Sequence, residues 1–195
     1  SPQQQREFFN VIHSEANRLG RLLNQLLDIQ QLEAGSMTVS MAAFDVQRMV
    51  QEVQEHIAPL VSEKQLRLSC RIAPNLGSIQ ADKEKIISCL VNLLGNAVKY
   101  TPEGGDIRLL AELQDTSVVI TVEDTGIGIA EDELPKIFER FYRCQDERIA
   151  DVEGNGLGLA FAMEVARLHA GELKVESQID EGSRFSLRLP VSQRV

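Results

Sequence analysis

The chain has 195 residues, of which 43% are hydrophobic and 25% are charged, and its formal net charge is −9. This is enough apolar material for one compact domain with an appendage. The acidic balance argues against broad binding to DNA or RNA, because their phosphate backbones select basic surfaces. A nucleotide is not excluded, since a few local cations and a metal ion can override the overall charge.

The cysteines and the apolar runs indicate the cellular compartment. Cys70, Cys89 and Cys144 are widely spaced and odd in number. This usage fits neither a disulfide framework nor a zinc site, and it predicts reduced thiols in a cytoplasmic compartment. No apolar run reaches membrane-spanning length and no signal peptide is visible. We therefore expect a soluble cytoplasmic portion, although its parent could be anchored in a membrane.

The first 35 residues predict one long helix. Its apolar residues recur in steps of three and four, as in a heptad seam, at Phe9, Ile12, Ala16, Leu19, Leu23 and Leu26. Flanking apolar residues make the stripe broader than a two-stranded seam, which favours packing in a helix bundle. Gly35 is a good helix stop. A core helix of the same domain is the alternative, but the globular pattern begins only after Gly35, which favours a protruding arm.

The rest of the chain predicts interleaved helices and strands. Asp45 caps a helix that runs to about Glu63, and Asp82 caps another that runs to about Tyr100. The inward positions of the first are Val46, Met49, Val50, Val53 and Ile57.

Further segments follow from alternation, turns and breakers. Strands are expected at residues 37–44, 66–72, 106–113, 117–123, 172–178 and 184–190. Helices are expected at residues 134–141 and 157–169, and a mobile polar loop at residues 143–155. Because many strands are joined by tight turns, we predict an α+β fold, a two-layer α/β sandwich with a mixed sheet and helices on one face.

The helix before Tyr100 carries a polar stripe. Asn92, Asn96 and Lys99 lie at positions i, i+4 and i+7, which places two amide oxygens and one ammonium along one face. Amide oxygens are hard ligands suited to Mg²⁺, and Lys99 can neutralise a phosphate. Taken alone, a solvated polar face explains the stripe equally well.

A glycine turn follows an apolar strand at Asp124-Thr125-Gly126-Ile127-Gly128. A carboxylate at the strand end can accept a hydrogen bond from the exocyclic amine of adenine, and this would select adenine over guanine. Gly126 and Gly128 allow the backbone to approach a planar base. For one such pair of glycines, a plain turn is the default interpretation.

A second glycine-rich turn, Gly154-Asn155-Gly156-Leu157-Gly158-Leu159, ends the polar loop and opens a helix. Free backbone N–H groups and the positive helix end form an anion site there. Arg143 in the same loop carries a guanidinium fork that could contact a terminal phosphate. Taken singly, this turn too is only moderate support for a site.

In this order the three segments resemble the GHKL ATPase superfamily and, within it, the catalytic ATP-binding domain of sensor histidine kinases. Residues 92–102 look like the N box, 124–129 like the G1 box, 137–143 like the F box and 154–159 like the G2 box. Residues 181–185 look like the closing Gly-Thr-x-Phe element, with Ser183 in the Thr place. Asn155 stands where these kinases commonly have Thr or Ser.

The resemblance implies the Bergerat or GHKL type of sandwich, with ATP and Mg²⁺ as ligands. Asn92 and Asn96 would be metal ligands, and Asn92, Lys99 and Arg143 would serve catalysis. Lys99, Tyr100 and Arg143 would touch phosphates or ribose, and Asp124 would contact adenine. The other nucleotide contacts implied are Gly126, Gly128, Ile129, Phe141, Gly154, Gly156, Leu157, Gly158, Leu159 and Ser183. Phe138 and Phe141 would anchor a lid on the core, and ordinary core packing explains them nearly as well.

Residues 1–35 resemble the second helix of a dimerisation and phosphotransfer hairpin, and residues 36–195 the catalytic domain. The family's phosphoacceptor lies on the first helix, in a His-Glu/Asp-x-x-Thr/Asn-Pro motif that this sequence lacks. His13 does not fit, because Ser14 occupies the acidic slot and no proline follows. His56 and His169 are expected at the surface or as caps.

The partners implied are ATP, a phosphoacceptor histidine helix of the parent protein and a response regulator receiver domain, with a homodimeric parent. We expect the chain to bind ATP without phosphorylating itself. Two other functions stay open: a non-catalytic nucleotide-binding regulatory or docking module, and a GHKL ATPase that drives a clamp. The ATPase needs a water-activating Glu, and Glu84 lies two turns from Asn92 rather than beside Asn96.

Overall fold

The computed structural model describes residue 27, residues 30–32, 34–74 and 76–149, residue 152 and residues 154–191. The chain divides into two compact units, Ser1–Met37 and Thr38–Val195. The heptad seam at Phe9 to Leu26 lies outside the described residues. In the first unit residues 30–32 are helical, and Gly35 has a φ of +63°, the conformation of a glycine that ends a helix.

The second unit holds all the regular elements that frame the site. In chain order they are β1 (Ala42–Asp45), α2 (Val46–Glu63), β2 (Arg67–Ile72), β3 (Ser78–Ala81), α3 (Lys83–Tyr100), β4 (Asp106–Gln114), β5 (Ser117–Asp124), the 3₁₀ turn η1 (Glu147–Ile149), α4 (Gly158–Leu168), β6 (Glu172–Gln178) and β7 (Gly182–Pro190).

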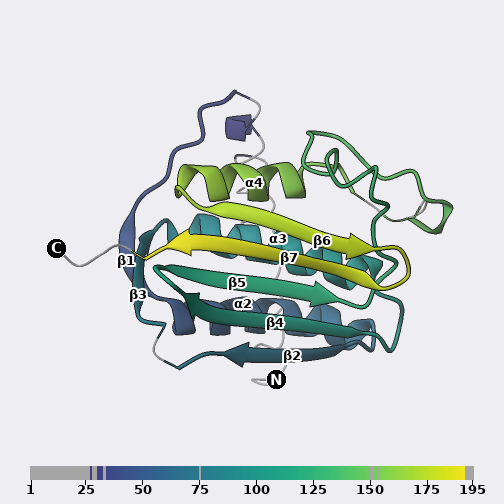
Figure 1. Cartoon of the computed structure of the whole chain (residues 1–195), viewed down its shortest axis with the longest axis horizontal. Helices are drawn as coiled ribbons and strands as arrows, with labels where there is room; N and C mark the ends of the chain where they lie inside the picture. The colour runs from purple at the N-terminus through teal and green to yellow at the C-terminus, as the bar shows by residue number, and fades with distance from the viewer. Residues whose placement is uncertain are drawn as a thin grey trace, which may run out of the picture. The chain divides into compact units, whose positions relative to one another are not determined.

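Five strands form one mixed sheet in the order β2-β4-β5-β7-β6. β2 and β4 are parallel, and the other neighbours are antiparallel. The helices α2, α3 and α4 lie side by side on one face of this sheet, while β1 and β3 form a separate antiparallel pair (Figure 1). The predicted α+β two-layer sandwich is therefore confirmed.

Two aspartates begin the long helices, as the sequence predicted. The Asp45 carboxylate accepts a hydrogen bond from the Arg48 amide at 2.8 Å, and the Asp82 carboxylate accepts one from the Lys85 amide at 3.1 Å. These bonds satisfy N–H groups that the first helical turn leaves without intrahelical partners. The second Asp82 oxygen accepts the Ser40 amide at 2.8 Å, which ties the segment before β1 to α3.

The core lies between the sheet and the three helices. Strand β5 runs through its centre, with residues Ser117 to Val122 all buried. The largest fully buried side chains on α3, β5 and β7 are Ile86, Leu90, Leu93, Leu94, Ile120, Leu187 and Leu189. Each such side chain contributes roughly 1.5–3 kcal/mol through the hydrophobic effect.

Two predicted elements were wrong in bounds or type, and one strand was not predicted. The strand expected at residues 37–44 begins only at Ala42, because the Ser40 amide is bound by Asp82 and β1 has only the four-residue β3 to pair with. Strand β3 itself was not predicted. The helix expected at residues 134–141 is a run of turns, in which the Glu139 amide donates to Lys136 O at 2.8 Å.

Leu90 tests the packing of α3. We expect Leu90→Ala to lower the free energy of unfolding by roughly 2–5 kcal/mol, because Leu90 is 0% exposed and its removal leaves a cavity. Urea unfolding of the whole chain measures the loss. The matched control is Leu60→Ala on α2, where Leu60 is 48% exposed, and a change of less than about 1 kcal/mol is expected there. Equal losses in the two variants would contradict this account of the core.

Candidate active site

The polar stripe of α3 lies beside its buried face. Asn92 and Asn96 are half-buried, and Lys99 is exposed. Tyr100, the last residue of α3, is half-buried, and this burial raises the pKa of its phenol, opposed by the nearby Arg143 guanidinium. Arg143 is therefore close enough to Tyr100 to act on it electrostatically.

Lys64 fixes the C-terminal end of α3, and sequence reasoning missed this residue. It is the C-cap residue of α2, and its ammonium donates to Val98 O and Lys99 O, each at 2.7 Å. These two carbonyls belong to the last helical turn, where oxygens lack intrahelical partners. Partial burial lowers the pKa of Lys64. The acceptors lie more than thirty residues away in sequence, so no local pattern could identify the contact.

Asp124 ends β5 with a carboxylate held by backbone amides. The Gly126 amide donates to Asp124 Oδ1 at 2.8 Å, and the Ser183 amide also donates to this carboxylate. Burial raises the pKa of Asp124 to about 6, and the two amides oppose this rise by stabilising the ionised form. The result is an acceptor, largely ionised at neutral pH, at the end of the central strand.

The first glycine turn is held between α3 and the β6–β7 hairpin. The Ile127 amide donates to Tyr100 O at 3.2 Å, and the Asp180 amide donates to Ile127 O at 2.9 Å. Gly128 has a φ of +69°, and a Cβ there would clash with Gln178 O. From the sequence, we expect Gly126 and Gly128 to let the backbone approach a planar base. In the structure, the close approach of the Gln178 backbone already requires a glycine at position 128.

The second glycine turn meets the start of α4. The Phe141 amide donates to Gly156 O at 2.9 Å, and Gly156 has a φ of +68°. A Cβ on Gly158, the first residue of α4, would lie 3.4 Å from Asn92 Oδ1, so this turn faces the polar stripe of α3. The Leu157 amide donates to Asn155 Oδ1 at 3.1 Å, which forms a local turn.

Other residues of this turn differ in exposure. Leu157 is buried and Leu159 is half-buried, whereas Gly154 is exposed and has no atom within 4 Å of an added Cβ.

The polar loop is tied to itself and to the β6–β7 hairpin. Arg143 donates to Val152 O at 2.6 Å and to Ile149 O at 3.5 Å, both within the loop. Arg148 in η1 pairs with Asp146 at 2.6 Å and with Asp180 in the hairpin turn at 2.5 Å. Exposed pairs of this kind are screened by solvent and contribute little to stability. They bias the position of the loop without locking it.

Phe141 was expected either to anchor a lid or to pack in the core, and its exposure excludes core packing. It is 60% exposed and has a φ of +65°, a conformation that is rare for a non-glycine residue. This conformation accompanies the hydrogen bond between the Phe141 amide and Gly156 O. Ile137 is the buried residue of this segment at 5% exposure, and Phe138 is half-buried.

Of the two positions expected for the lone histidines, at the surface or as a cap, His56 has the first, being exposed, and His169 has the second. His169 is the C-cap residue of α4 and is 3% exposed. Its Nε2 accepts the Asp82 amide at 2.9 Å, so its Nδ1 carries the proton and donates to Val165 O at 2.7 Å. His169 is therefore a neutral link between the end of α4 and the start of α3.

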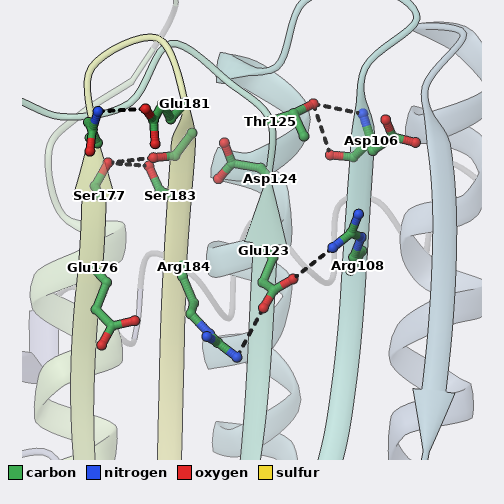
Figure 2. A pocket seen from close by; sticks show the side chains of 12 residues that line it. Asp106, Arg108, Glu123, Asp124, Thr125, Glu176, Ser177, Glu181, Ser183 and Arg184 are labelled. Carbon is green, nitrogen blue, oxygen red and sulfur yellow. Dashed lines mark hydrogen bonds and ion pairs between the residues drawn. The ribbon is translucent and has the colours of Figure 1, made fainter.

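A groove of about 440 Å³ lies over β4, β5, β7 and β6, and its lining includes Asp124, Ser177 and Ser183. Figure 2 shows a row of charges across these strands, and the row follows the strand register: Arg108, Glu123, Arg184 and Glu176. Glu123 pairs with Arg184 at 3.1 Å and with Arg108 at 3.6 Å. Side chains alternate along a strand, so this row faces away from the helices, and Asp124 and Ser183 face toward them.

The three sequence segments therefore converge on one end of the helix-covered face. Tyr100 contacts the first glycine turn, and Asn92 contacts the second. A mixed sheet covered on one side by helices, with an asparagine helix and two glycine turns at one end, defines the GHKL class of ATP-binding domains.

The family model described as histidine kinase-, DNA gyrase B-, and HSP90-like ATPase matches residues 81–193. The chain belongs to this family and carries the catalytic ATP-binding domain of a sensor histidine kinase.

Individual relatives agree with this assignment. An uncharacterized sensor-like histidine kinase of Rhizobium meliloti is 33% identical over 95% of this chain and 35% of its own length. The circadian input-output histidine kinase CikA of Synechococcus elongatus is 31% identical over 96% of this chain and 25% of its own length. The solved structure of full-length ShkA in complex with AMPPNP has a TM-score of 0.77 and 29% identity, covering 98% of this chain and 40% of that one.

The chain thus spans about a quarter to a third of these two curated relatives. Within the part of the chain that the structure describes, no helix has both the length and the apolar character needed to cross a bilayer.

The raised pKa of Asp124 predicts a pH dependence of stability. The folded pKa is about 6, and an unfolded aspartate titrates near 3.9. Between these values the folded chain binds more protons, so the free energy of unfolding falls as pH rises through that window. Asp124→Asn keeps the shape and removes the titration.

Urea unfolding of the ligand-free chain between pH 5 and pH 7 measures this difference. We expect the wild type to lose about 1 kcal/mol relative to Asp124→Asn over that range. Asp115→Asn, in the exposed turn after β4, is the control and should follow the wild type. A constant difference between wild type and Asp124→Asn would refute the raised pKa.

Proposed function

We propose that this chain binds Mg-ATP and transfers the γ-phosphoryl group to a histidine imidazole that lies outside the given sequence. The observation that carries the proposal is the convergence of α3, the first glycine turn and the start of α4 on one end of the sheet. The ShkA structure contains AMPPNP, an analogue of ATP, and this supports ATP as the nucleotide bound.

The transfer needs positioning and charge neutralisation more than acid–base chemistry. An imidazole nitrogen attacks the γ-phosphorus, and the bond to the bridging oxygen breaks to release ADP. The proposed catalytic residues are Asn92, Lys99 and Arg143, whose donors and charges would stabilise the phosphates in the transition state. A neutral imidazole is already nucleophilic, so little base assistance is required.

The donor set of α3 fits Mg²⁺. Asn92 and Asn96 offer neutral amide oxygens one helical turn apart, and both are half-buried. In the described segments no cluster of three or more His, Cys, Asp and Glu side chains could hold a metal ion. A site with few protein ligands suits Mg²⁺, which takes its remaining ligands from phosphates and water. Bound there, the ion would supply neutralisation of phosphate charge.

The remaining site residues extend the proposal. Asp124 and Ser183 would contact the adenine edge, and Tyr100 would contact ribose or phosphate. The other proposed nucleotide contacts lie in or beside the two glycine turns: Gly126, Gly128, Ile129, Phe141, Gly154, Gly156, Leu157, Gly158 and Leu159. The first-turn amides of α4 offer donors suited to phosphate oxygens.

Residues 1–35 are proposed as the second helix of a dimerisation and phosphotransfer hairpin, with residues 36–195 as the catalytic domain. The proposed partners are the acceptor histidine helix of the parent protein and a response regulator receiver domain. A homodimeric parent and a cytoplasmic location belong to the same proposal.

Two alternatives compete with this function. A clamp-driving ATPase needs a carboxylate that activates water beside the metal site. Glu84 is exposed in the first turn of α3, and eight residues separate it from Asn92, which is about 12 Å along a helix. This distance disfavours the ATPase. A regulatory nucleotide-binding module would bind ATP in the same pocket without transfer.

A transfer assay separates the three functions. The chain is mixed with a separately produced phosphoacceptor hairpin and ATP labelled at the γ-phosphate. We expect acid-labile label on the hairpin and none on this chain, and a hairpin with His→Gln at its acceptor is the control. Binding without transfer would favour the regulatory module, rapid ATP hydrolysis without hairpin would favour the ATPase, and label on this chain would contradict an external acceptor.

The proposed metal ligands predict a loss of magnesium dependence. In Asn96→Ala, the gain in ATP affinity on adding Mg²⁺ should shrink by about tenfold, because one amide oxygen is removed. Calorimetry at several Mg²⁺ concentrations measures this gain. Gln47→Ala, at an exposed position of α2, is the control and should behave as wild type. An unchanged magnesium dependence in Asn96→Ala would exclude Asn96 as a ligand.

A further inference from the structure

Ser177 lies in one row with the two proposed adenine contacts. Ser177 on β6 is directly opposite Ser183 on β7, and Ser183 is directly opposite Asp124 on β5. Alternation along the strands places all three side chains on the helix-covered face. Figure 2 shows the three residues on neighbouring strands, with Ser177 bonded to Ser183.

The Ser177 hydroxyl has three neighbours at hydrogen-bond distance. Gly182 O lies 2.8 Å away, Ser183 Oγ lies 2.9 Å away, and the Ile129 amide nitrogen lies 2.9 Å away. A hydroxyl has one proton to donate and two lone pairs to accept with. The Gly182 carbonyl can only accept, so it takes the Ser177 proton. The Ile129 amide can only donate, so it donates to one lone pair of Ser177 Oγ.

The remaining lone pair of Ser177 must then accept from Ser183. The proton of the Ser183 hydroxyl therefore points to Ser177, and the lone pairs of Ser183 Oγ are available to a ligand. Asp124, the next residue in the row, already uses its carboxylate as an acceptor for the Gly126 amide. Asp124 and Ser183 therefore present oxygen lone pairs side by side, and this pattern complements an exocyclic amine.

The same hydroxyl holds the first glycine turn. The Ile129 amide follows Gly128, and its bond to Ser177 joins the turn to β6. Without the Ser177 oxygen, this amide and the Gly182 carbonyl would each lose a partner. The hydroxyl thus acts on both sides of the proposed base pocket, although it was not among the sequence-predicted site residues.

We propose that Ser177 is a positioning residue for base recognition: its hydroxyl orients the Ser183 hydroxyl beside Asp124 and holds the glycine turn at Ile129. The nucleotide feature recognised through this arrangement is the 6-amino group of adenine. This inference rests on the proposed ATP-binding function.

Calorimetry of the full chain with two nucleotides tests the proposal. The nucleotides are ATP and purine riboside triphosphate, which lacks the 6-amine. In Ser177→Ala the Kd for ATP should rise about tenfold, and the preference for ATP over the analogue should fall by a similar factor. The matched control is Ser186→Ala on β7. Ser186 also bonds to another hydroxyl, Thr121 Oγ1 at 3.2 Å, but alternation places it on the opposite face. It should leave both values unchanged.

A pair of variants with equal shape isolates the hydroxyl if Ser177→Ala unfolds. Ser177→Thr keeps the oxygen and should retain the preference for ATP, whereas Ser177→Val should lose it. Ser183→Ala should lower the preference as Ser177→Ala does, and the double variant should lose little more, because the two residues act as one unit.

Each outcome separates this inference from the proposed function. If the wild type binds ATP and Ser177→Ala keeps its preference for ATP, Ser177 has no positioning role. An equal loss of affinity for both nucleotides would assign Ser177 a structural role only and also overturn the inference. If the wild type binds neither nucleotide, the proposed function itself fails, and the inference fails with it.

Discussion

The register of β5 between β4 and β7 is the constraint on which the site depends. Val118, Ile120 and Val122 are 0% exposed on the helix-covered face, and the same alternation puts Asp124 on that face at the end of the strand. A slip of one residue would exchange Asp124 with Glu123 and bury a charge that now pairs with arginines on the open face. Packing of the core thereby fixes the position of the acceptor.

Helix α3 serves the core and the site at once. Its buried face packs against the sheet and α4, and its polar stripe meets the start of α4 at Gly158. The side chain of Asp82, the residue before α3, fixes the start of the helix. The side chain of Lys64, at the end of α2, fixes the end of α3. Movement of α3 along its axis is therefore opposed at both ends, which keeps Asn92 and Asn96 in place relative to the glycine turns.

The β6–β7 hairpin joins parts that the sequence separates. Ser177 and Asp180 hold the first glycine turn, and Asp180 also pairs with Arg148 in the polar loop. The bonds to the turn are half-buried or between backbone atoms, whereas the ion pair is exposed and weak. The first glycine turn, which we propose contacts the base, is therefore held more firmly by the hairpin than the polar loop is.

Local spacing and backbone chemistry were enough to predict the caps at Asp45 and Asp82, most of the strand and helix pattern, and the order of the glycine turns. The sequence also identified Asn92, Asn96 and Asp124 as candidates. It predicted a helix at residues 134–141 that the structure does not contain, and it missed β3, Lys64 and Ser177. Each of these depends on a partner distant in sequence: β1 for β3, the end of α3 for Lys64, and the Ile129 amide for Ser177. Such contacts follow from the packing of distant segments, because a hydroxyl or an ammonium can bind many partners and the fold brings one of them within reach.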